Sequence, residues 1–270
     1  MTKKDAIIIG SGQAGNPLAI KLAEAGWKTV LIDKSEKMLG GVCVNAGCTP
    51  SKTLIASAKV LHTIKISEKH GINLINPQVD FSETQKRKDK IVKDSRKGIK
   101  KNLEDADCLE LVIGTASFSG EKSVKVQKAN GKTEEFTAPN IFINAGCRPA
   151  VPEIKGLDEI KWYDSTGILD LNEIPEKLII IGSGYIGLEM GQMYSRFGSE
   201  VHIIEKSRQI LSKEDQDVAK DIQKILEAEG LKFHLNLKTE RVVQTTNGIS
   251  VEVSGKGKKQ KINGTHLLVV

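Results

Sequence analysis

The chain has 270 residues, 39% of them hydrophobic and 27% charged, which is ordinary for a globular protein of about two domains. Its longest apolar runs, such as Leu178–Ile181, are far shorter than the ~20 residues of a membrane-spanning helix. The formal net charge of +6 raises the question of a nucleic-acid partner, but no recognised nucleic-acid-binding motif accompanies it. We therefore expect neither a membrane nor a nucleic acid as a partner.

The first residues, MTKKD, lead directly into the strand-like run AIII, and no secretory signal precedes that run. A reducing, cytoplasmic location is therefore expected, in which a lasting structural disulfide is unfavourable. Closely spaced cysteines in such a compartment are more often catalytic or metal-binding.

Residues 6–33 predict a strand, a glycine-rich turn, a helix and a second strand. The run AIII is followed by GSGQAG, a G-x-G-x-x-G fingerprint with glycines at Gly10, Gly12 and Gly15. Apolar residues then recur at helical spacing until Gly26, and Asp33 stands at the end of the second strand. In a dinucleotide-binding unit such glycines admit the pyrophosphate to the helix N-terminus, and the acid accepts hydrogen bonds from ribose hydroxyls.

The segment GGVCVNAGCTPSK, residues 40–52, carries two cysteines, Cys43 and Cys48. A structural disulfide, half of a metal site and a redox pair are the three alternatives. C-x4-C is a poor zinc spacing, and no second pair follows: Cys108 and Cys147 are isolated in strand-like contexts and are expected to be small buried residues. A redox pair is favoured, and no metal site is expected.

The residues after Cys48 predict a helix, and Pro50 suits its first turn. A helix N-terminus and the positive charge of Lys52 both favour a thiolate at Cys48. Glycines on both sides of the cysteine pair would let a flat cofactor approach it closely. The apolar face of this helix would comprise Leu54, Ala58 and Leu61.

A lysine-rich segment, Lys86–Lys101, supplies much of the positive charge. Ser82 and Gln85 form a capping-box signature in front of it. We interpret the segment as an amphipathic helix with a solvated lysine face, in preference to a nucleic-acid-binding patch. Its apolar stripe would comprise Ile91, Ile99 and Leu103.

A hairpin and a linker complete the first half of the chain. Alternating valines lead to Asn130-Gly131, a hairpin turn signal, and the chain returns through a strand-like run that ends before Gly146. Pro149 and Pro152 then mark a linker. We predict two domains, one at 1–150 and the other at 151–270.

Residues 178–205 repeat the first unit. The run LIII precedes GSGYIG, a helix runs to Gly198, and the next strand ends in Glu205. The landmarks 10/182, 12/184, 15/187 and 33/205 all differ by 172. One fingerprint alone is weak, but two in the same register, each followed by an acid, indicate two dinucleotide sites. The glycines of the second fingerprint are Gly182, Gly184 and Gly187.

The second half also carries a hairpin signal, Asn247-Gly248, and a return strand at Leu267–Val270. The predicted fold is therefore α/β: two Rossmann-like, three-layer modules, each with an added antiparallel β meander. The first return strand leads into Ala-Gly, whereas the second stops at Val270, so the internal repeat suggests that the chain is cut short.

These motifs carry a resemblance. GGVCVNAGCTPSK, the two fingerprints, the Gly-Cys-Arg-Pro stretch from Gly146 and GYIGLE at 184–189 are similar, in order, to those of the class I pyridine nucleotide-disulfide oxidoreductases. That family includes dihydrolipoamide dehydrogenase, glutathione reductase and mercuric reductase. The resemblance covers essentially the whole chain, and variants such as GSGQAG and CTPSKTLIASA are closer to the mercuric-reductase-like branch.

The resemblance implies an FAD-binding domain at 1–150, an NAD(P)-binding domain at 151–270 and a mechanism. NAD(P)H at Gly182–Gly187 would reduce FAD, whose ADP end would lie at Gly10–Gly15 with Asp33 on its ribose. Reduced flavin would open a Cys43–Cys48 disulfide, with Cys48 nearer the flavin and Cys43 attacking the substrate. The remaining residues that the resemblance places at the site are Gly41 and Val42 beside the flavin, Lys52 paired with Glu189, Gly114 and Ala116 near the adenine, and Gly146.

The chain departs from the family pattern at several positions. Val42 replaces the usual threonine, and Asn16 and Pro17 follow the first fingerprint. The family's C-terminal interface domain, with the His–Glu pair that serves the interchange thiol, would lie beyond Val270. The full-length protein is expected to be a homodimer.

The expected function follows from this resemblance. It is a flavin-dependent disulfide oxidoreductase that acts on a disulfide or on Hg(II). Glu205 favours NADH, although Lys206 and Arg208 could accommodate a 2′-phosphate. The alternative is a non-catalytic dinucleotide-binding or redox-sensing module.

Overall fold

The structure is a computed structural model that describes residues 1–73, 78–255 and 257–270. The chain divides into two compact units, one formed by Met1–Pro50 with Lys88–Arg148 and the other by Ser51–Arg87 with Pro149–Val270. The predicted cofactor-binding domains, 1–150 and 151–270, stay a prediction, and the compact units group residues 51–87 with the second half of the chain. Within the described residues no helix is both long and apolar enough to cross a membrane.

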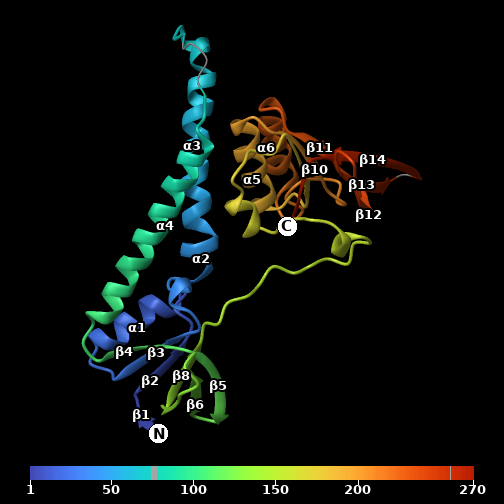
Figure 1. Ribbon diagram of the computed structural model, residues 1–270. Coiled ribbons are helices and arrows are strands. Elements are labelled where there is room, and N and C mark those ends of the chain that lie inside the picture. The colour runs from blue at the N-terminus through green and yellow to red at the C-terminus, as the bar shows by residue number, and fades with distance from the viewer. Residues whose placement is uncertain (74–77, 256) are drawn as a thin grey trace. The chain divides into compact units, whose positions relative to one another are not determined.

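The first unit is built on a parallel sheet in the order β4-β3-β2-β8. Alternate residues of its strands face opposite layers. Ile7 and Ile32 pack with the meander strands, whereas Ile8 and Leu31 pack with Ala19 of helix α1 and with other helical residues. The sheet strands and α1, labelled in Figure 1, are β2 (Ala6–Ile9), β3 (Thr29–Asp33), β4 (Leu109–Ile113), β8 (Asn140–Ile143) and α1 (Gly15–Glu24).

The other layer of this unit is a four-stranded sheet in the order β1-β7-β6-β5, whose hairpins β5–β6 and β6–β7 are antiparallel. The predicted turn at Asn130-Gly131 is confirmed: Gly131 has a left-handed φ of +80° and joins β6 to β7. The strands are β1 (Thr2–Lys3), β5 (Thr115–Gly120), β6 (Ser123–Gln127) and β7 (Thr133–Thr137).

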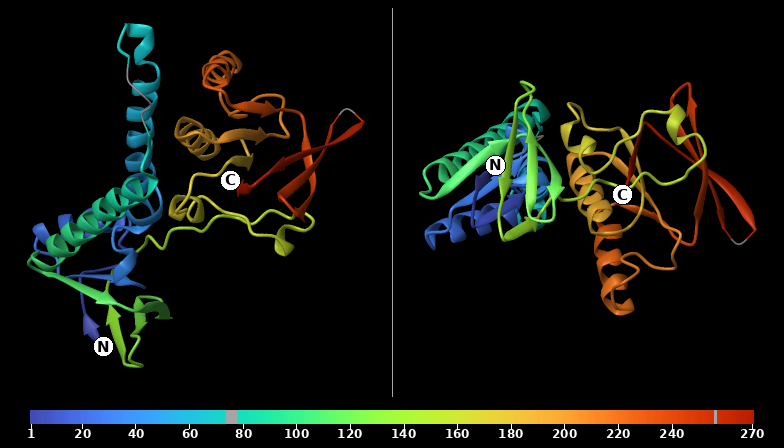
Figure 2. Two further views of the ribbon diagram at one scale, coloured as in Figure 1. Left: turned by 45° about the horizontal axis from the view of Figure 1, so that its top comes forward. Right: turned by 90° about the horizontal axis from the view of Figure 1, so that it is seen from below.

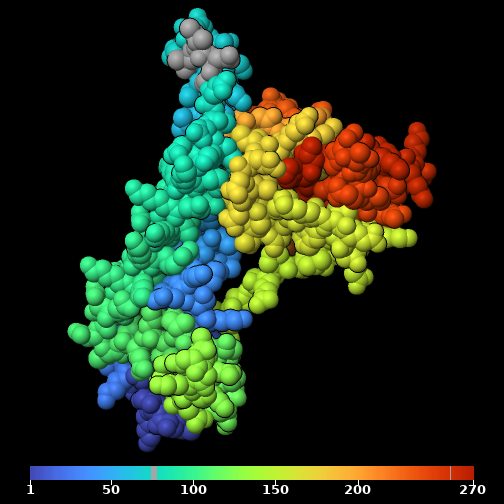
Figure 3. Space-filling model, viewed as in Figure 1, coloured from blue at the N-terminus to red at the C-terminus, as the bar shows by residue number. Residues whose placement is uncertain are grey.

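The helices predicted after Cys48 and in the lysine-rich segment are present as α3 (Cys48–Lys65) and α4 (Phe81–Glu104). A short helix that was not predicted, α2 (Gly41–Ala46), carries Cys43. Leu54 and Ala58 of α3 are fully buried in the core of the second unit, as the apolar pattern predicts. Within that unit the N-terminal end of α4 lies beside α3, where Arg87 Nη1 donates to the Thr53 carbonyl oxygen at 3.2 Å (Figure 3).

The predicted capping box at Ser82 and Gln85 is wrong. Helix α4 begins at Phe81, and Asp80 caps it by accepting from the Glu83 N–H at 3.0 Å. Gln85 is instead buried, and its amide donates to the carbonyl oxygens of Leu169 and Leu171. Asp80 and Ser82 are both capping-type residues, and the sequence pattern favoured Ser82. Only the residue at which the helix begins decides between them.

The second unit repeats the parallel sheet, in the order β11-β10-β9-β15. In Figure 2 the meander β12–β14 lies on the opposite side of this sheet from α5 and α6, and Ile179 packs toward the meander while Ile180 packs toward the helices. The elements are β9 (Lys177–Ile181), α5 (Tyr185–Phe197), β10 (Glu200–Ile204), α6 (Gln216–Ala228), β11 (Lys232–His234), β12 (Lys238–Thr245), β13 (Gly248–Gly255), β14 (Lys258–Gly264) and β15 (His266–Val269).

Among the residues that the structure describes, four short 3-10 turns connect these elements: η1 (Glu36–Met38), η2 (Ser67–His70), η3 (Leu157–Glu159) and η4 (Gly167–Asp170). Each unit thus contains a parallel sheet between helices and a meander. The predicted three-layer α/β fold with two equivalent modules is confirmed.

Candidate functional site

The first fingerprint forms a tight turn between β2 and α1. Gly10 has a left-handed φ of +102°, and a Cβ there would lie 2.2 Å from the Asn144 carbonyl oxygen. A Cβ on Gly15 would lie 1.9 Å from the Gly10 carbonyl oxygen. At Gly12, by contrast, the nearest atom to such a Cβ is Gly41 Cα at 3.9 Å, an ordinary van der Waals contact, so this position is not sterically forbidden.

The carboxylate of Asp33 is fixed at the end of β3. Its Oδ2 accepts from the Ser11 N–H at 2.9 Å and from the Ser11 hydroxyl, and its Oδ1 accepts from the Ser35 N–H at 3.1 Å. Ser11 is fully buried. The predicted ribose acid is therefore held in one orientation, by two serines that sequence reasoning did not single out.

The second fingerprint reproduces this geometry. Gly182 has a φ of +112°, and a Cβ there would lie 2.0 Å from the Val270 carbonyl oxygen; a Cβ on Gly187 would lie 2.3 Å from the Gly182 carbonyl oxygen. Gly184 faces open space within 4 Å. The two turns thus share the same two forbidden positions, and in both the middle glycine is uncrowded.

Glu205 occupies the position equivalent to Asp33. Its Oε2 accepts from the Ser183 N–H at 3.1 Å and hydroxyl at 2.7 Å, and its Oε1 accepts from the Ser207 N–H at 2.8 Å. Burial favours the neutral acid, but these hydrogen bonds outweigh it and hold the pKa of Glu205 below its usual value. Glu205 is therefore a charged, oriented acceptor at the end of β10.

The two cysteines of the candidate redox pair are brought together by the turn between α2 and α3. Both are in the thiol form in this structure, with no disulfide between them. A hydrogen bond to Cys48, followed in importance by burial, raises the pKa of the Cys43 thiol, and a backbone hydrogen bond from Cys48 partly offsets this rise. Gly47 makes this approach feasible, because a Cβ there would lie 3.0 Å from the Val42 carbonyl oxygen and 3.3 Å from Cys43 Cα.

The cysteine segment also packs on the first fingerprint. Gly41 has a φ of +69°, and a Cβ on it would lie 2.7 Å from Gly12 Cα. The Gly40 N–H donates to the Ser11 hydroxyl at 3.3 Å. Val42 is 51% exposed beside this contact. The backbone that carries Cys43 is therefore in contact with the loop that is predicted to bind the first dinucleotide.

Three other residues are predicted to contact the first cofactor. Gly114 follows β4, Ala116 lies at the start of β5, and Gly146 follows β8. The Gly114 N–H donates to the Asp33 carbonyl oxygen at 2.9 Å, and a Cβ on Gly114 would lie 2.6 Å from Val126 Cγ1. Ala116 packs against the core beneath the meander. Gly146 follows β8 with a φ of +73° and open space around it.

Lys52 and Glu189 form an ion pair between α3 and α5, within the second unit. Their side chains are 57% and 44% exposed, so the pair remains in contact with solvent. The pairing expected from the family resemblance is therefore present in the structure.

The prediction that Cys108 and Cys147 are small buried residues is wrong, because both are exposed. Cys108 has a left-handed φ of +63° immediately before β4, and Cys147 follows β8 outside any strand. The strand-like sequences around them misled the prediction, because each cysteine stands just outside the strand itself.

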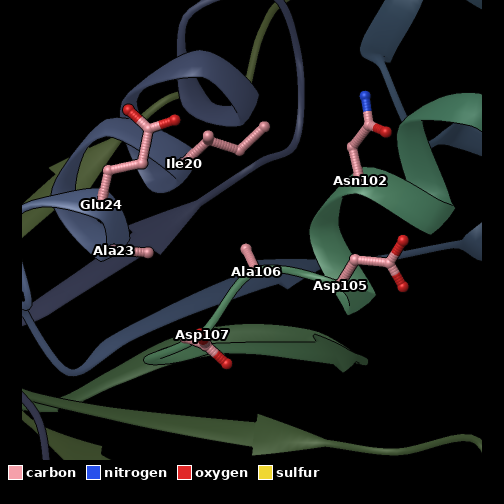
Figure 4. Close-up of a pocket in the computed structure, with 7 residues that line it drawn as sticks. All are labelled: Ile20, Ala23, Glu24, Asn102, Asp105, Ala106 and Asp107. Atoms are coloured by element: carbon pink, nitrogen blue, oxygen red, sulfur yellow. The ribbon is translucent and has the colours of Figure 1, made fainter.

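A pocket of about 480 Å³ lies apart from these residues in the first unit, between the C-terminal ends of α1 and α4. Figure 4 shows its polar side chains, Glu24, Asn102, Asp105 and Asp107, pointing in different directions. In the part of the chain that the structure describes, no group of three or more His, Cys, Asp or Glu side chains is arranged to hold a metal ion. We therefore place the candidate site at the two fingerprints and the cysteine pair.

Both fingerprints fit a dinucleotide. Each offers an uncrowded middle glycine just before a helix N-terminus and an oriented carboxylate at the end of the neighbouring strand. FAD would be held at Gly10–Gly15 and Asp33, and NAD(P)H at Gly182–Gly187 and Glu205.

Comparison with known proteins agrees with this geometry. The family model described as pyridine nucleotide-disulphide oxidoreductase matches residues 4–270. The chain is 38% identical over 252 residues to the probable pyridine nucleotide-disulfide oxidoreductase RclA of Escherichia coli, covering 93% of this chain and 53% of RclA. It is 36% identical to the mitochondrial dihydrolipoyl dehydrogenase of Pisum sativum, covering 99% of this chain and 54% of that one.

A mercuric reductase of Bacillus cereus is also similar, at 36% identity over 98% of this chain and 41% of that enzyme. Among solved structures, a Cu(II) complex of Escherichia coli RclA superposes with a TM-score of 0.85 at 36% identity, covering all of this chain and 56% of RclA. The chain spans about half the length of the curated relatives it matches. The two fingerprints, the cysteine pair and the match over residues 4–270 together show that this chain belongs to the pyridine nucleotide-disulphide oxidoreductase family.

Proposed function

We propose that the whole protein is an FAD- and NAD(P)H-dependent oxidoreductase in which Cys43 and Cys48 alternate between dithiol and disulfide. The observation that carries this proposal is the contact between Gly41 of the cysteine segment and Gly12 of the first fingerprint. It puts the backbone that bears Cys43 against the loop that would hold a dinucleotide. A dithiol/disulfide couple exchanges two electrons, as a hydride-transferring cofactor does.

The first fingerprint would bind FAD. Gly12 has no side chain to block a pyrophosphate from the N-terminus of α1, and Asp33 offers a lone pair to a ribose hydroxyl. FAD supplies the two-electron chemistry that links nicotinamide to thiols. Gly41 and Val42 would border it on the side of the cysteines, and Gly114, Ala116 and Gly146 lie around the ends of β4 and β8.

The second fingerprint would bind the nicotinamide dinucleotide, and we propose NADH as the preferred form. Glu205 is held ionised by Ser183 and Ser207, and a fixed carboxylate accepts from free ribose hydroxyls but repels a 2′-phosphate. Lys206 and Arg208 follow Glu205 within three residues, and their positive charges would attract a 2′-phosphate and so reduce the preference for NADH.

The two cysteines would have different roles. Cys43 would be the interchange thiol, and its hydrogen bond to Cys48 raises the pKa of its thiol. Cys48, at the start of α3, would face the cofactor. Lys52, near the start of α3, would add positive charge beside the pair, and its contact with Glu189 would hold it there.

The substrate would be a disulfide or a thiol-binding metal ion. The relatives include a dihydrolipoyl dehydrogenase and mercuric reductases, and one solved RclA structure is a Cu(II) complex. Both substrate classes suit a dithiol, which exchanges with disulfides and binds soft metal ions. We further propose that the whole protein is a cytoplasmic homodimer whose remaining part supplies an acid–base pair to Cys43.

The test uses the full-length protein, its Cys43→Ser and Cys48→Ser variants, and stoichiometric NADH. Wild-type protein should be yellow and should gain a long-wavelength charge-transfer band on two-electron reduction. Cys43→Ser should keep such a band and Cys48→Ser should lose it. A colourless protein whose thiols never pair would identify a non-catalytic module, and the reverse cysteine result would invert the two roles. Turnover with lipoamide, glutathione disulfide, Hg(II) and Cu(II) would identify the substrate class.

A further inference from the structure

Asn45 lies between the two cysteines in the sequence, and its side chain is hydrogen-bonded to the backbone that precedes Cys43. Its amide nitrogen Nδ2 donates to the carbonyl oxygen of Leu39 at 2.9 Å and to that of Gly41 at 2.8 Å. Both acceptors precede Cys43, whereas Asn45 follows it by two positions. The side chain therefore closes the short stretch of backbone that carries Cys43.

Arg96 of α4 holds the other end of the same amide. Its Nε donates to Asn45 Oδ1 at 2.7 Å, and both residues are half-buried. The orientation of the amide is fixed chemically, because a guanidinium can only donate and the two backbone carbonyls can only accept. Each hydrogen-bonding end of Asn45 thus has a partner.

Helix α4, which carries Arg96, is packed firmly in the first unit. Leu103 is fully buried, and Ile99, one turn after Arg96, packs so closely on the cysteine segment that a Cβ on Gly40 would lie 2.7 Å from Ile99 Cδ1. All of these residues belong to the first compact unit. Arg96 therefore links the cysteine segment to a well-packed helix.

The cysteine segment needs such support. Helix α2 has six residues, too few to be stable alone; it follows one left-handed glycine, Gly40, and begins at another, Gly41. The redox equilibrium of a dithiol depends on how closely its two sulfurs are held when the disulfide is open. A loose segment would lower the effective concentration of one thiol at the other and so disfavour the disulfide.

We propose that Asn45 and Arg96 are positioning residues that hold Cys43 against Cys48 and so set the redox equilibrium of the pair. This inference rests on the proposed function only in requiring that the two cysteines form a disulfide. The asparagine controls the backbone before Cys43, and the arginine orients the asparagine. Neither residue needs to touch a substrate.

The experiment measures this equilibrium in glutathione buffers of varied ratio, by trapping thiols at fixed pH. Two glutathione molecules give up two electrons and two protons to form one glutathione disulfide, while the Cys43–Cys48 disulfide becomes two thiols. In Arg96→Met the constant for disulfide formation should fall about tenfold, equivalent to ~30 mV toward easier reduction. The constant should fall similarly in Asn45→Asp, which keeps an acceptor for Arg96 but loses both hydrogen-bond donors of the side chain.

Two further variants make the result specific. Lys97→Met removes the same charge from a neighbouring exposed residue of α4 and should leave the constant within twofold of wild type. Arg96→Lys retains a nitrogen donor and should recover most of the loss. If Arg96→Met fails to fold, Asn45→Asp and Arg96→Lys still give the comparison.

The outcomes separate the two proposals. A wild-type protein that forms no Cys43–Cys48 disulfide at any glutathione ratio contradicts the proposed function itself. If the wild-type disulfide forms but its equilibrium constant is unchanged in Arg96→Met and Asn45→Asp, the positioning role is overturned and the function stands. An equal shift in Lys97→Met would likewise overturn it, because general charge would then explain the effect.

Discussion

Ser183 donates two hydrogen bonds, from its backbone N–H and its hydroxyl, to the same carboxylate oxygen of Glu205. Ser11 makes the same two bonds to Asp33 in the other module. A carboxylate offers about four lone-pair positions, and Ser207 occupies another on Glu205. The acid is thus prepared to receive roughly one further hydroxyl in a defined direction.

Glu205→Gln should weaken NADH binding about five- to tenfold, because one charge-assisted hydrogen bond to ribose is worth ~1–1.5 kcal/mol more than its neutral counterpart. NADPH affinity should be unchanged or improved, since the charge that opposes a 2′-phosphate is gone. Fluorescence titration with both dinucleotides gives the ratio. Glu227→Gln, at an exposed position of α6, is the matched control. An equal loss for NADH and NADPH would argue against ribose recognition by Glu205.

Gly41→Ala should destabilise the protein through both backbone strain and collision with Gly12. Gly26→Ala separates the two effects, because Gly26 has a similar left-handed φ of +81° but open space around it. We expect Gly41→Ala to cost about 1–3 kcal/mol more than Gly26→Ala. Thermal unfolding followed by circular dichroism measures the difference, at roughly 2–4 °C per kcal/mol. Equal melting temperatures would mean that the two loops can separate without cost.

Lys52→Met should leave the melting temperature almost unchanged, because an ion pair exposed on both sides contributes only ~0–1 kcal/mol. If Lys52 acts beside the flavin, the rate of flavin reduction by NADH should nevertheless fall at least about tenfold. Stopped-flow absorbance on the full-length protein measures that rate. Glu189→Gln should cause a smaller fall in the same direction. A large loss of stability with an unchanged rate would assign the pair a structural role instead.

A histidine pair in the second unit should make stability depend on pH. His202 Nδ1 and His234 Nε2 lie 2.8 Å apart, and His202 Nε2 lies 2.9 Å from Glu200 Oε1. Burial, with the nearby charges of Lys177 and Lys232, lowers the pKa of both histidines. Glu200 stays ionised, because hydrogen bonds from Lys232 and His202 lower its pKa to about 2.

The folded protein therefore favours the neutral form of both histidines. Their contribution to the free energy of unfolding is complete above about pH 6.5 and is lost as the pH falls below that value. The melting temperature should drop from about pH 7.5 to about pH 5.5, and the drop should be roughly halved in His234→Gln. His70→Gln, at an exposed histidine, should follow the wild-type curve. An identical drop in all three proteins would show that the pair is not responsible.

The features that sequence could predict are those fixed by local backbone geometry. Gly10 and Gly182 must be glycine because their φ angles are left-handed and a carbonyl oxygen fills the space of a Cβ. The internal repeat and the two dinucleotide-binding turns could be predicted because such glycines recur at equivalent positions in both halves of the chain. The apolar face of α3 was likewise predictable from spacing, since Leu54 and Ala58 are both fully buried.

The features that sequence could not predict depend on contacts between distant segments. Ser11 and Asn45 look like ordinary polar residues until the fold brings Asp33 and Arg96 to them. A serine at the second fingerprint position, followed by an acid 22 residues later in both repeats, was a signal that could have been used. Cys108 was misplaced because exposure depends on where a strand begins, which local sequence defines poorly.

The contact between Gly12 and Gly41 also bears on how the protein can be recombined with its relatives. The two glycines belong to separate motifs, yet a side chain on Gly41 would occupy the space of Gly12 Cα. A chimera that takes its fingerprint from one relative and its cysteine segment from another joins two backbones that were not fitted to each other. Crossover points placed before residue 6 and after residue 52 keep this pair of loops from one parent, and chimeras cut between them should be recovered less often as folded protein.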